Sequence, residues 1–337
     1  MRKLLYGVLL LVALLVLVGF TLPSSHRVAV STEIDAHAAT VFAQINDFRR
    51  YTLWAPGLDI DPNARVLYSG NNSGVGAILT WDGPLTGSGT QTIVESTPFE
   101  RVGILINGGE PGEAIAQFDL APGTGTTIVT WQFEVDYGMN IVGRYFAPMF
   151  GRIIARDNQL GLQQLKELAE SLPAEDFSDL QVEHAIVEAD EIAFIRATSL
   201  PQPAEIADAM RAAYLDILTF IDELGLEEAG APLSITRVYS GSSLIFDAAI
   251  PVRGVTESTP RERGDVKLGS TYEGQVIRVR HKGSYRTLAR THRKIAAYLT
   301  AHGIERNGDA WEAYVSDPSL VREEELLTFV YYPVRID

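Results

Sequence analysis

The stretch Leu326-Leu327-Thr328-Phe329-Val330-Tyr331-Tyr332-Pro333-Val334 is apolar and aromatic, and only three residues of the chain follow it. A run of this composition predicts a buried strand instead of a frayed terminus. An earlier stretch, Leu244-Ile245-Phe246-Asp247-Ala248-Ala249-Ile250-Pro251-Val252, has the same pattern and also ends in Pro-Val. Two strands with one signature predict a duplicated unit, and we expect a ligand-binding crevice where the two units meet.

The residues around these strands predict the same succession of elements twice. In the first unit we expect a strand, a helix closed by Gly225 and two further strands, at 191–197, 203–224, 233–239 and 244–252. In the second unit the corresponding elements fall at 273–280, 284–301, 311–315 and 326–334. Each unit is therefore expected to be a strand–helix–strand–strand module.

Strand alternation assigns candidate site residues to faces. Phe329 and Tyr331 share one face of the last strand, and matching the two units places Asp247 at the position of Phe329. Phe329 either contacts a ligand or fills the crevice, and Asp247 is either solvent-exposed or an acid that points into the crevice. Trp311 and Tyr314 precede the last hairpin and belong either to a core or to an aromatic ligand-binding wall.

These residues resemble the GyrI-like effector-binding domain, a ligand-binding module of many AraC- and MerR-type regulators. The resemblance covers about 183–337 and is carried by three segments: Val279-Arg280-His281-Lys282-Gly283-Ser284-Tyr285, Trp311-Glu312-Ala313-Tyr314-Val315-Ser316-Asp317-Pro318, and Glu324-Glu325-Leu326-Leu327-Thr328 before Tyr332-Pro333-Val334. It implies a cavity between the two units for amphipathic or cationic organic molecules. Many members carry a buried Glu after the Thr of the last strand, where this chain has Phe329. The substitution favours an apolar ligand over a cation, with Asp247 as the reserve acid.

The first half of the chain predicts a curved antiparallel sheet between two helices. A strand at 27–34 leads to a helix at 38–50, and glycine-containing turns then separate alternating segments from 64 to 136. These glycines predict hairpin turns and not phosphate-binding loops, because none precedes Lys-Ser/Thr or opens a helix. A long helix from about 140 to 171 closes the domain. Its apolar stripe contains Tyr145, Phe146, Phe150, Ile153, Ile154, Leu162, Leu165 and Leu168.

This half resembles the SRPBCC superfamily (START-like, polyketide-cyclase-like), over about 26–172. The matching segments follow one another in the order of that family: Ala39-Thr40-Val41-Phe42, Asn46-Asp47-Phe48-Arg49-Arg50-Tyr51, Trp54-Ala55-Pro56, Asp61-Pro62, Gly76 with Trp81, Ile93-Val94-Glu95-Ser96-Thr97-Pro98, Val129-Thr130-Trp131 and Gly161-Leu162-Gln163-Gln164-Leu165-Lys166. The resemblance implies a helix-grip fold with a pocket for a lipid-like or aromatic ligand. Trp54, Trp81 and Trp131 are expected to face this pocket, its rim or the core.

Arg2 and Lys3 precede an uncharged apolar run from Leu4 to Leu22. The run is long enough to cross a bilayer, and the preceding positive charge predicts an N-terminus inside and the following domains outside. The competing interpretation is a cleaved signal peptide, but no small-x-small cleavage site is visible near its end. We therefore expect an uncleaved anchor.

Composition excludes several kinds of chemistry. The absence of cysteine excludes disulfides, thiolate catalysis and thiolate metal sites. The net charge of −15 argues against nucleic-acid binding, which depends on neutralising phosphates. The six histidines do not pair with carboxylates at metal-ligand spacing, and no Gly-x-Ser-x-Gly nucleophile elbow occurs. No cofactor, metal or catalytic residue is predicted.

We thus predict an α+β protein of four segments: a transmembrane anchor at 1–23, a helix-grip domain at 24–172, a linker at 173–182 and a duplicated effector-binding domain at 183–337. We expect a bacterial membrane protein that binds or senses an apolar or amphipathic small molecule outside the cytoplasm, without nucleic acid. The alternatives are a cyclase or hydrolase acting in one of the two pockets, and a structural partner protein at the membrane surface.

Overall fold

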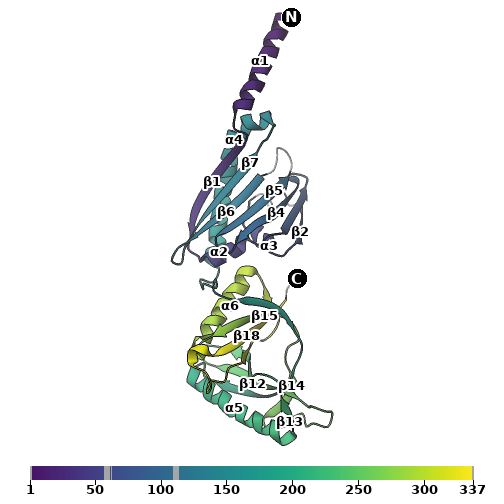
Figure 1. Cartoon of the computed structure of the whole chain (residues 1–337), viewed down its shortest axis with the longest axis vertical. Coiled ribbons are helices and arrows are strands. Elements are labelled where there is room, and N and C mark those ends of the chain that lie inside the picture. Colours follow the sequence, from purple (N-terminus) through teal and green to yellow (C-terminus); the bar gives the residue numbers. More distant parts are fainter. Residues whose placement is uncertain (1, 57–60, 62, 109–113, 336–337) are drawn as a thin grey trace. The chain divides into compact units, whose positions relative to one another are not determined.

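The computed structural model describes residues 2–56, 61, 63–108 and 114–335 (Figure 1). The chain forms two compact units. Unit 1 contains the described residues up to Ser178 together with Ala301–Gly303, and unit 2 contains Asp179–Thr300 and the described residues from Ile304 onward. The α+β fold class is confirmed, with antiparallel sheets, packed helices and one apolar N-terminal helix.

Helix α1 (Arg2–Thr21) opens unit 1. Its segment Leu4–Thr21 is long and apolar enough to cross a membrane, and a signal sequence shares both properties. Its side chains are almost all exposed, so that within the described residues this helix is not part of a protein core.

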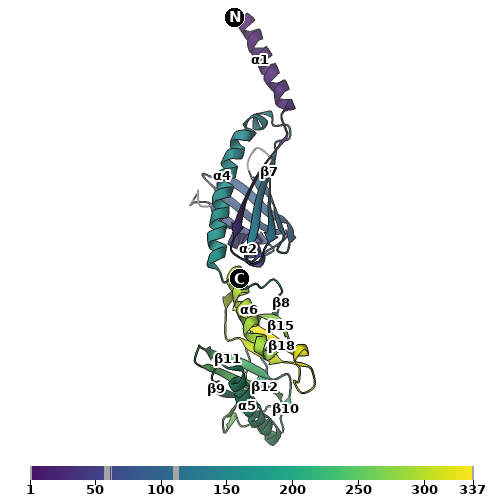
Figure 2. The same cartoon turned by 90° about the vertical axis from the view of Figure 1, so that its left-hand side faces the viewer.

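Unit 1 contains one seven-stranded antiparallel sheet in the order β1-β7-β6-β5-β4-β3-β2. The strands are β1 (Ser25–Ile34), β2 (Arg65–Gly70), β3 (Ala77–Gly83), β4 (Gly87–Thr97), β5 (Arg101–Gly108), β6 (Ala114–Pro122) and β7 (Thr127–Asp136). Helices α2 (Ala38–Ile45) and α3 (Phe48–Tyr51) and the long helix α4 (Ile141–Ser171) accompany the sheet, and Figure 2 shows α4 running along it. The core places α2 and the second half of α4 against the sheet, with Phe118 and Leu162 fully buried.

Helix α4 departs from the expected burial pattern. Leu162 and Leu165 are buried as a closing helix requires, but Tyr145, Phe146 and Phe150 are exposed. Within the described residues, the predicted apolar stripe therefore covers the core only in its second half.

Unit 2 contains a sheet whose main path is β13-β14-β9-β12-β11-β17-β18-β15-β8. The strands are β8 (Val182–Val187), β9 (Glu191–Ser199), β10 (Glu227–Glu228), β11 (Leu233–Tyr239), β12 (Leu244–Arg253), β13 (Glu262–Arg263), β14 (Val266–Ser270), β15 (Gly274–Lys282), β16 (Glu305–Arg306), β17 (Trp311–Tyr314) and β18 (Leu327–Arg335). The two copies of the duplicated module, β9-β12-β11 and β15-β18-β17, meet where β11 pairs with β17. The predicted duplication is therefore visible as a near-symmetric sheet.

The helices α5 (Pro203–Leu224) and α6 (Leu288–His302) pack on one face of this sheet. Two short 3₁₀ helices, η1 (Tyr285–Thr287) and η2 (Glu323–Glu325), complete the unit. Helix α5 buries Phe246 and Ala248 of β12, and α6 buries Val330 and Tyr332 of β18. A second apolar cluster, which contains Trp311, occupies the other face. We call these the helix face and the open face.

Candidate ligand-binding site

The short strand β17 lies at the centre of unit 2, between β11 and β18. Because side chains alternate along a strand, Trp311 and Ala313 lie on the open face, whereas Glu312 and Tyr314 lie on the helix face. Glu312 is directly opposite Ser234 of β11 and therefore sits at the junction of the two modules.

Glu312 is the centre of a hydrogen-bonded group on the helix face. Its Oε1 is 2.7 Å from His292 Nε2 of α6, and its Oε2 accepts a hydrogen bond from the Tyr314 hydroxyl. The other ring nitrogen of His292, Nδ1, is 2.8 Å from Oη of Tyr332. An ionised carboxylate only accepts hydrogen bonds, so His292 Nε2 is the donor to Glu312. We call Glu312, His292, Tyr314 and Tyr332 the Glu312 cluster.

Further aromatic side chains surround this cluster. The Tyr285 ring meets the Tyr314 ring edge-on, with centroids 5.3 Å apart. From α5, Tyr214 donates a hydrogen bond of 2.8 Å to the Leu233 carbonyl, and Met210 Sδ lies 4.0 Å from the Tyr314 hydroxyl. The carboxylate is thus enclosed by tyrosines that come from several elements.

The tyrosines keep their protons over the physiological range. Burial, and then the negative charge of Glu312, raise the pKa of Tyr314 well above its ordinary value. Burial likewise raises the pKa of Tyr214, and it raises the pKa of Tyr332 to about 12. These hydroxyls are therefore neutral at neutral pH.

Two side chains of the cluster are partly exposed. The side chain of Glu312 is 16% exposed and that of His292 is 25% exposed. Thr328 is fully buried opposite Tyr314, and its hydroxyl has no hydrogen-bond partner among the described residues. A buried hydroxyl without a partner is costly to the folded state.

The open face carries three of the predicted residues. The Trp311 and Tyr331 rings are stacked, with centroids 4.8 Å apart, and Phe329 lies beside Tyr331 at 6.4 Å. The guanidinium of Arg278 lies 5.0 Å from the centre of the Phe329 ring. Phe329 and Tyr331 therefore share a face as predicted, and Trp311 lies with them, while Tyr314 lies on the opposite face; their role as ligand contacts stays a prediction.

Asp247 differs from one of the two expectations. The Asp247 side chain lies on the open face and is 0% exposed. The interpretation of Asp247 as a solvent-exposed acid is therefore wrong. Its Oδ1 accepts a hydrogen bond of 2.8 Å from Arg196, and its Oδ2 accepts a hydrogen bond of 2.8 Å from Arg237. Its role as a ligand contact stays a prediction, since both carboxylate oxygens already bind guanidinium groups.

In unit 1, Trp54 and Trp131 pack edge-on in the core, with centroids 5.8 Å apart. Trp54 donates to the Gln44 carbonyl, whereas the Trp131 indole N–H and the Asn158 side-chain NH₂ are buried without a partner among the described residues. Trp81 is half-buried and its ring lies directly over Gly89 of the neighbouring strand. The two unpaired donors are suited to a ligand that carries a hydrogen-bond acceptor.

Sequence reasoning missed Glu312 and His292. In the segment Trp311-Glu312-Ala313-Tyr314 only the aromatic residues were predicted to belong to a site, and Asp247 was predicted as the acid. Alternation along β17 was the available signal, because it sets Glu312 on the same face as Tyr314. The pairing with His292, twenty positions earlier on α6, depends on how the helix packs.

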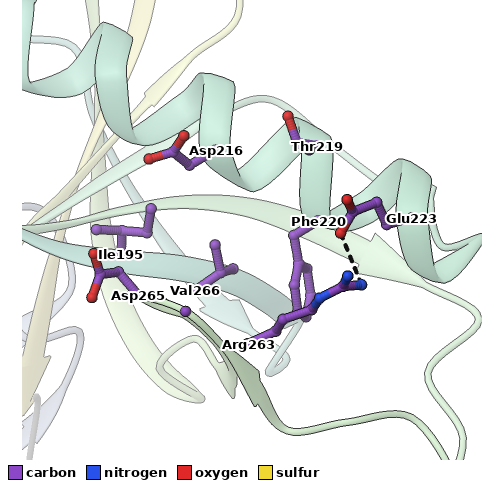
Figure 3. Close-up of a pocket in the computed structure, with 9 residues that line it drawn as sticks. Ile195, Asp216, Thr219, Phe220, Glu223, Arg263, Asp265 and Val266 are labelled. Atoms are coloured by element: carbon purple, nitrogen blue, oxygen red, sulfur yellow. Dashed lines mark ion pairs between the residues drawn. The ribbon is translucent and has the colours of Figure 1, made fainter.

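Two hollows lie elsewhere on unit 2. One, of about 240 Å³, lies between α5 and the β13–β14 hairpin, and Figure 3 shows Arg263 paired with Glu223 at its edge. The other, of about 310 Å³, contains Arg280, Arg290 and Lys294. Neither contains a predicted site residue. In the part of the chain that the structure describes, no three His, Asp or Glu side chains are grouped to hold a metal ion.

Comparisons with known proteins agree with this organisation. Residues 25–170 match the family model for polyketide cyclase/dehydrase and lipid transport, and residues 237–335 match that for the GyrI-like small-molecule-binding domain. A search of curated proteins found no match.

Among solved structures, the EcmrR C-terminal domain is 13% identical, with a TM-score of 0.39, covering 47% of this chain and 99% of that one. EcmrR in a complex with DNA is 14% identical, with a TM-score of 0.41 and coverage of 59% and 72%. A hydrolase from Listeria innocua is 14% identical, with a TM-score of 0.34 and coverage of 46% and 91%.

Proposed function

Because the chain carries a polyketide-cyclase-like domain followed by a GyrI-like small-molecule-binding domain, we propose that it is a membrane-anchored receptor for amphipathic organic molecules. The GyrI-like domain binds the polar or cationic group of the ligand at the Glu312 cluster. Helix α1 anchors the protein, and both domains lie outside the cytoplasm.

The observation that carries this proposal is the partly exposed Glu312 carboxylate among tyrosine rings. A carboxylate attracts a cation, and the faces of tyrosine rings add a further attraction of about 0.5–2 kcal/mol each. Phe329 had favoured a purely apolar ligand, but Glu312 supplies an acid from the other face of the sheet and so extends the ligand class to organic cations.

The anchor rests on the N-terminal sequence. Arg2 and Lys3 precede an apolar helix of sufficient length, and positive residues next to a span favour the cytoplasmic side. This arrangement directs residues after Thr21 to the opposite side. A receptor in this position encounters molecules before they enter the cell, or as they leave it.

A matched pair of probes tests the binding proposal. Phenyltrimethylammonium and tert-butylbenzene have nearly the same shape, but only the first is charged. The full-length protein in detergent is expected to gain thermal stability with the cation, and much less with the neutral probe at equal concentration. Equal stabilisation by both probes would limit the site to apolar recognition, and stabilisation by neither would contradict the proposal.

A further inference from the structure

The outward side of α4 changes character along its length. In the first half, six large apolar side chains are each 38% to 66% exposed: Val142, Tyr145, Phe146, Met149, Phe150 and Ile153. Their spacing of three and four places them along one stripe of the helix. In the second half, the exposed positions are mostly polar, with Arg156, Asp157, Gln163, Gln164 and Glu167, while Leu160 remains apolar.

The inward side of the same half explains why the large residues point outward. The buried positions there are Gly143, Ala147 and Gly151, and a Cβ on Gly151 would come within 2.2 Å of the His26 ring. Only small residues fit between this part of the helix and the sheet. The apolar stripe is therefore directed away from the domain, where a contiguous apolar surface of this kind marks an interaction site.

The stripe begins next to the end of α1. Gly19 of α1 lies so close to α4 that a Cβ on it would come within 2.1 Å of Ile141. Arg144 donates to the carbonyl of Leu22 at 3.1 Å, and the Tyr145 hydroxyl donates to the carbonyl of Leu15 at 2.6 Å. Figures 1 and 2 both show the first turns of α4 beside the end of α1.

These contacts set the depth of α4. Leu15 lies six residues before Thr21, the last residue of α1, which is about 9 Å along the helix axis. If α1 crosses a bilayer, a side chain bonded to the Leu15 carbonyl lies below the membrane surface. The start of α4 must then be in the bilayer interface as well.

We infer that the apolar stripe of α4 is embedded in the outer interface of the bilayer that α1 crosses. The inference rests on the proposed anchor. The stripe from Val142 to Ile153 is about 16 Å long, which is comparable to the thickness of an interfacial layer plus the outermost acyl region. Arg152 and Arg156 are exposed where the stripe ends, and arginines at this level suit phosphate headgroups. The bilayer is favoured over a protein partner because the stripe is continuous with the apolar surface of α1.

The absence of cysteine makes a direct test possible. Single cysteines are introduced at Met149 or Phe150 in the full-length chain and carry a nitroxide spin label. The protein is reconstituted in vesicles of phosphatidylcholine and phosphatidylglycerol at a ratio of about 3:1. Collision of the label with oxygen, which is enriched in the bilayer, is compared with collision with a water-soluble nickel chelate.

The ratio of oxygen collisions to nickel collisions is expected to be several-fold higher for labels at 149 and 150 than for control labels. The control labels replace two exposed apolar residues of unit 2, Ile186 and Leu320. A label at Val12 of α1 reports on the anchor separately. If the label at 12 is inserted in lipid but the labels at 149 and 150 are accessible to nickel, the inference is overturned while the anchor stands. Low collision with both reagents at 149 and 150 indicates a protein partner and also overturns it. A nickel-accessible label at 12 would refute the anchor, and the inference with it.

Discussion

Two acidic residues of unit 2 have different surroundings, and these decide what each can do. Asp247 is fully buried and bound by Arg196 and Arg237, so its charge is balanced within the protein. Glu312 is partly exposed and bound by one histidine and one tyrosine, so it can still meet a cation. Strand periodicity predicted that Phe329 and Tyr331 share a face, but it could not predict these partners, which depend on the packing of distant strands and of α6.

Asp247 is expected to be structural. In Asp247→Asn, Arg196 and Arg237 lose a buried carboxylate partner, and the weakened charge-assisted hydrogen bonds are expected to cost about 1.5–3 kcal/mol, because both guanidinium groups remain partly exposed. Urea unfolding of the variant should show a correspondingly lower midpoint. Asp309→Asn is the matched control, because Asp309 also binds Arg237 but is 43% exposed, and its loss should cost no more than about 1 kcal/mol. Equal effects of the two substitutions would contradict this assignment.

The buried tyrosines predict a loss of stability in alkali. Burial raises the pKa of Tyr332 to about 12, whereas an unfolded tyrosine titrates near 10. The unfolded chain therefore loses this proton first, and the stabilising contribution, complete below pH 10, disappears as the pH rises to about 12. In Tyr332→Phe, unfolding free energy measured between these values should fall less steeply with pH. An unchanged slope would show that Tyr332 is not protected in the folded state.

At the scale of elements, the sequence predicts type and order well and surroundings less well. The duplicated module was predicted from the shared pattern of two strands, and α5 has the predicted bounds, Pro203–Leu224. Strands β8 and β14 were missed, and so were β10, β13 and β16, whose two residues are too few to show a periodicity. The apolar stripe of α4 was recognised, but periodicity indicates only that a face is apolar, and not whether protein or lipid covers it.

The second half of α4 depends on a glycine. A Cβ on Gly161 would come within 2.8 Å of the Trp131 ring and 2.7 Å of Pro56. We expect Gly161→Ala to destabilise unit 1 by about 1–3 kcal/mol through overpacking, although alanine is the better helix former. Thermal unfolding followed by tryptophan fluorescence would measure this change. Gln164→Ala, at an exposed position of the same helix, should be nearly neutral. A stabilised Gly161→Ala protein would show that the helix does not approach Trp131 as described.

At the scale of the whole molecule, the proposed membrane-anchored receptor rests on the order of the segments. The sequence carries both family patterns and the apolar N-terminal run, and so the architecture could be proposed from residues alone. The proposed ligand site could not be derived in this way, because the Glu312 cluster combines side chains from β17, β18 and α6.

The proposed topology can be examined in intact cells. A single cysteine at Ile186, in the otherwise cysteine-free chain, should react with a membrane-impermeant maleimide in spheroplasts without permeabilisation. We expect this labelling because the proposed topology places residues after Thr21 outside the cytoplasm. A cysteine placed before Leu4 should react only after permeabilisation. Labelling of Ile186→Cys only after permeabilisation would place the domains in the cytoplasm.

The measurement that tests the central claim most directly is the affinity of the full-length protein for phenyltrimethylammonium, determined by calorimetry with the native residue and with Glu312→Gln. We predict a dissociation constant at least about tenfold higher in the variant, because a charge-assisted contact contributes about 1.5 kcal/mol or more. Glu324→Gln, which removes an exposed carboxylate bound to Arg322, should leave the affinity unchanged. Equal affinities of the native protein and Glu312→Gln would contradict the account.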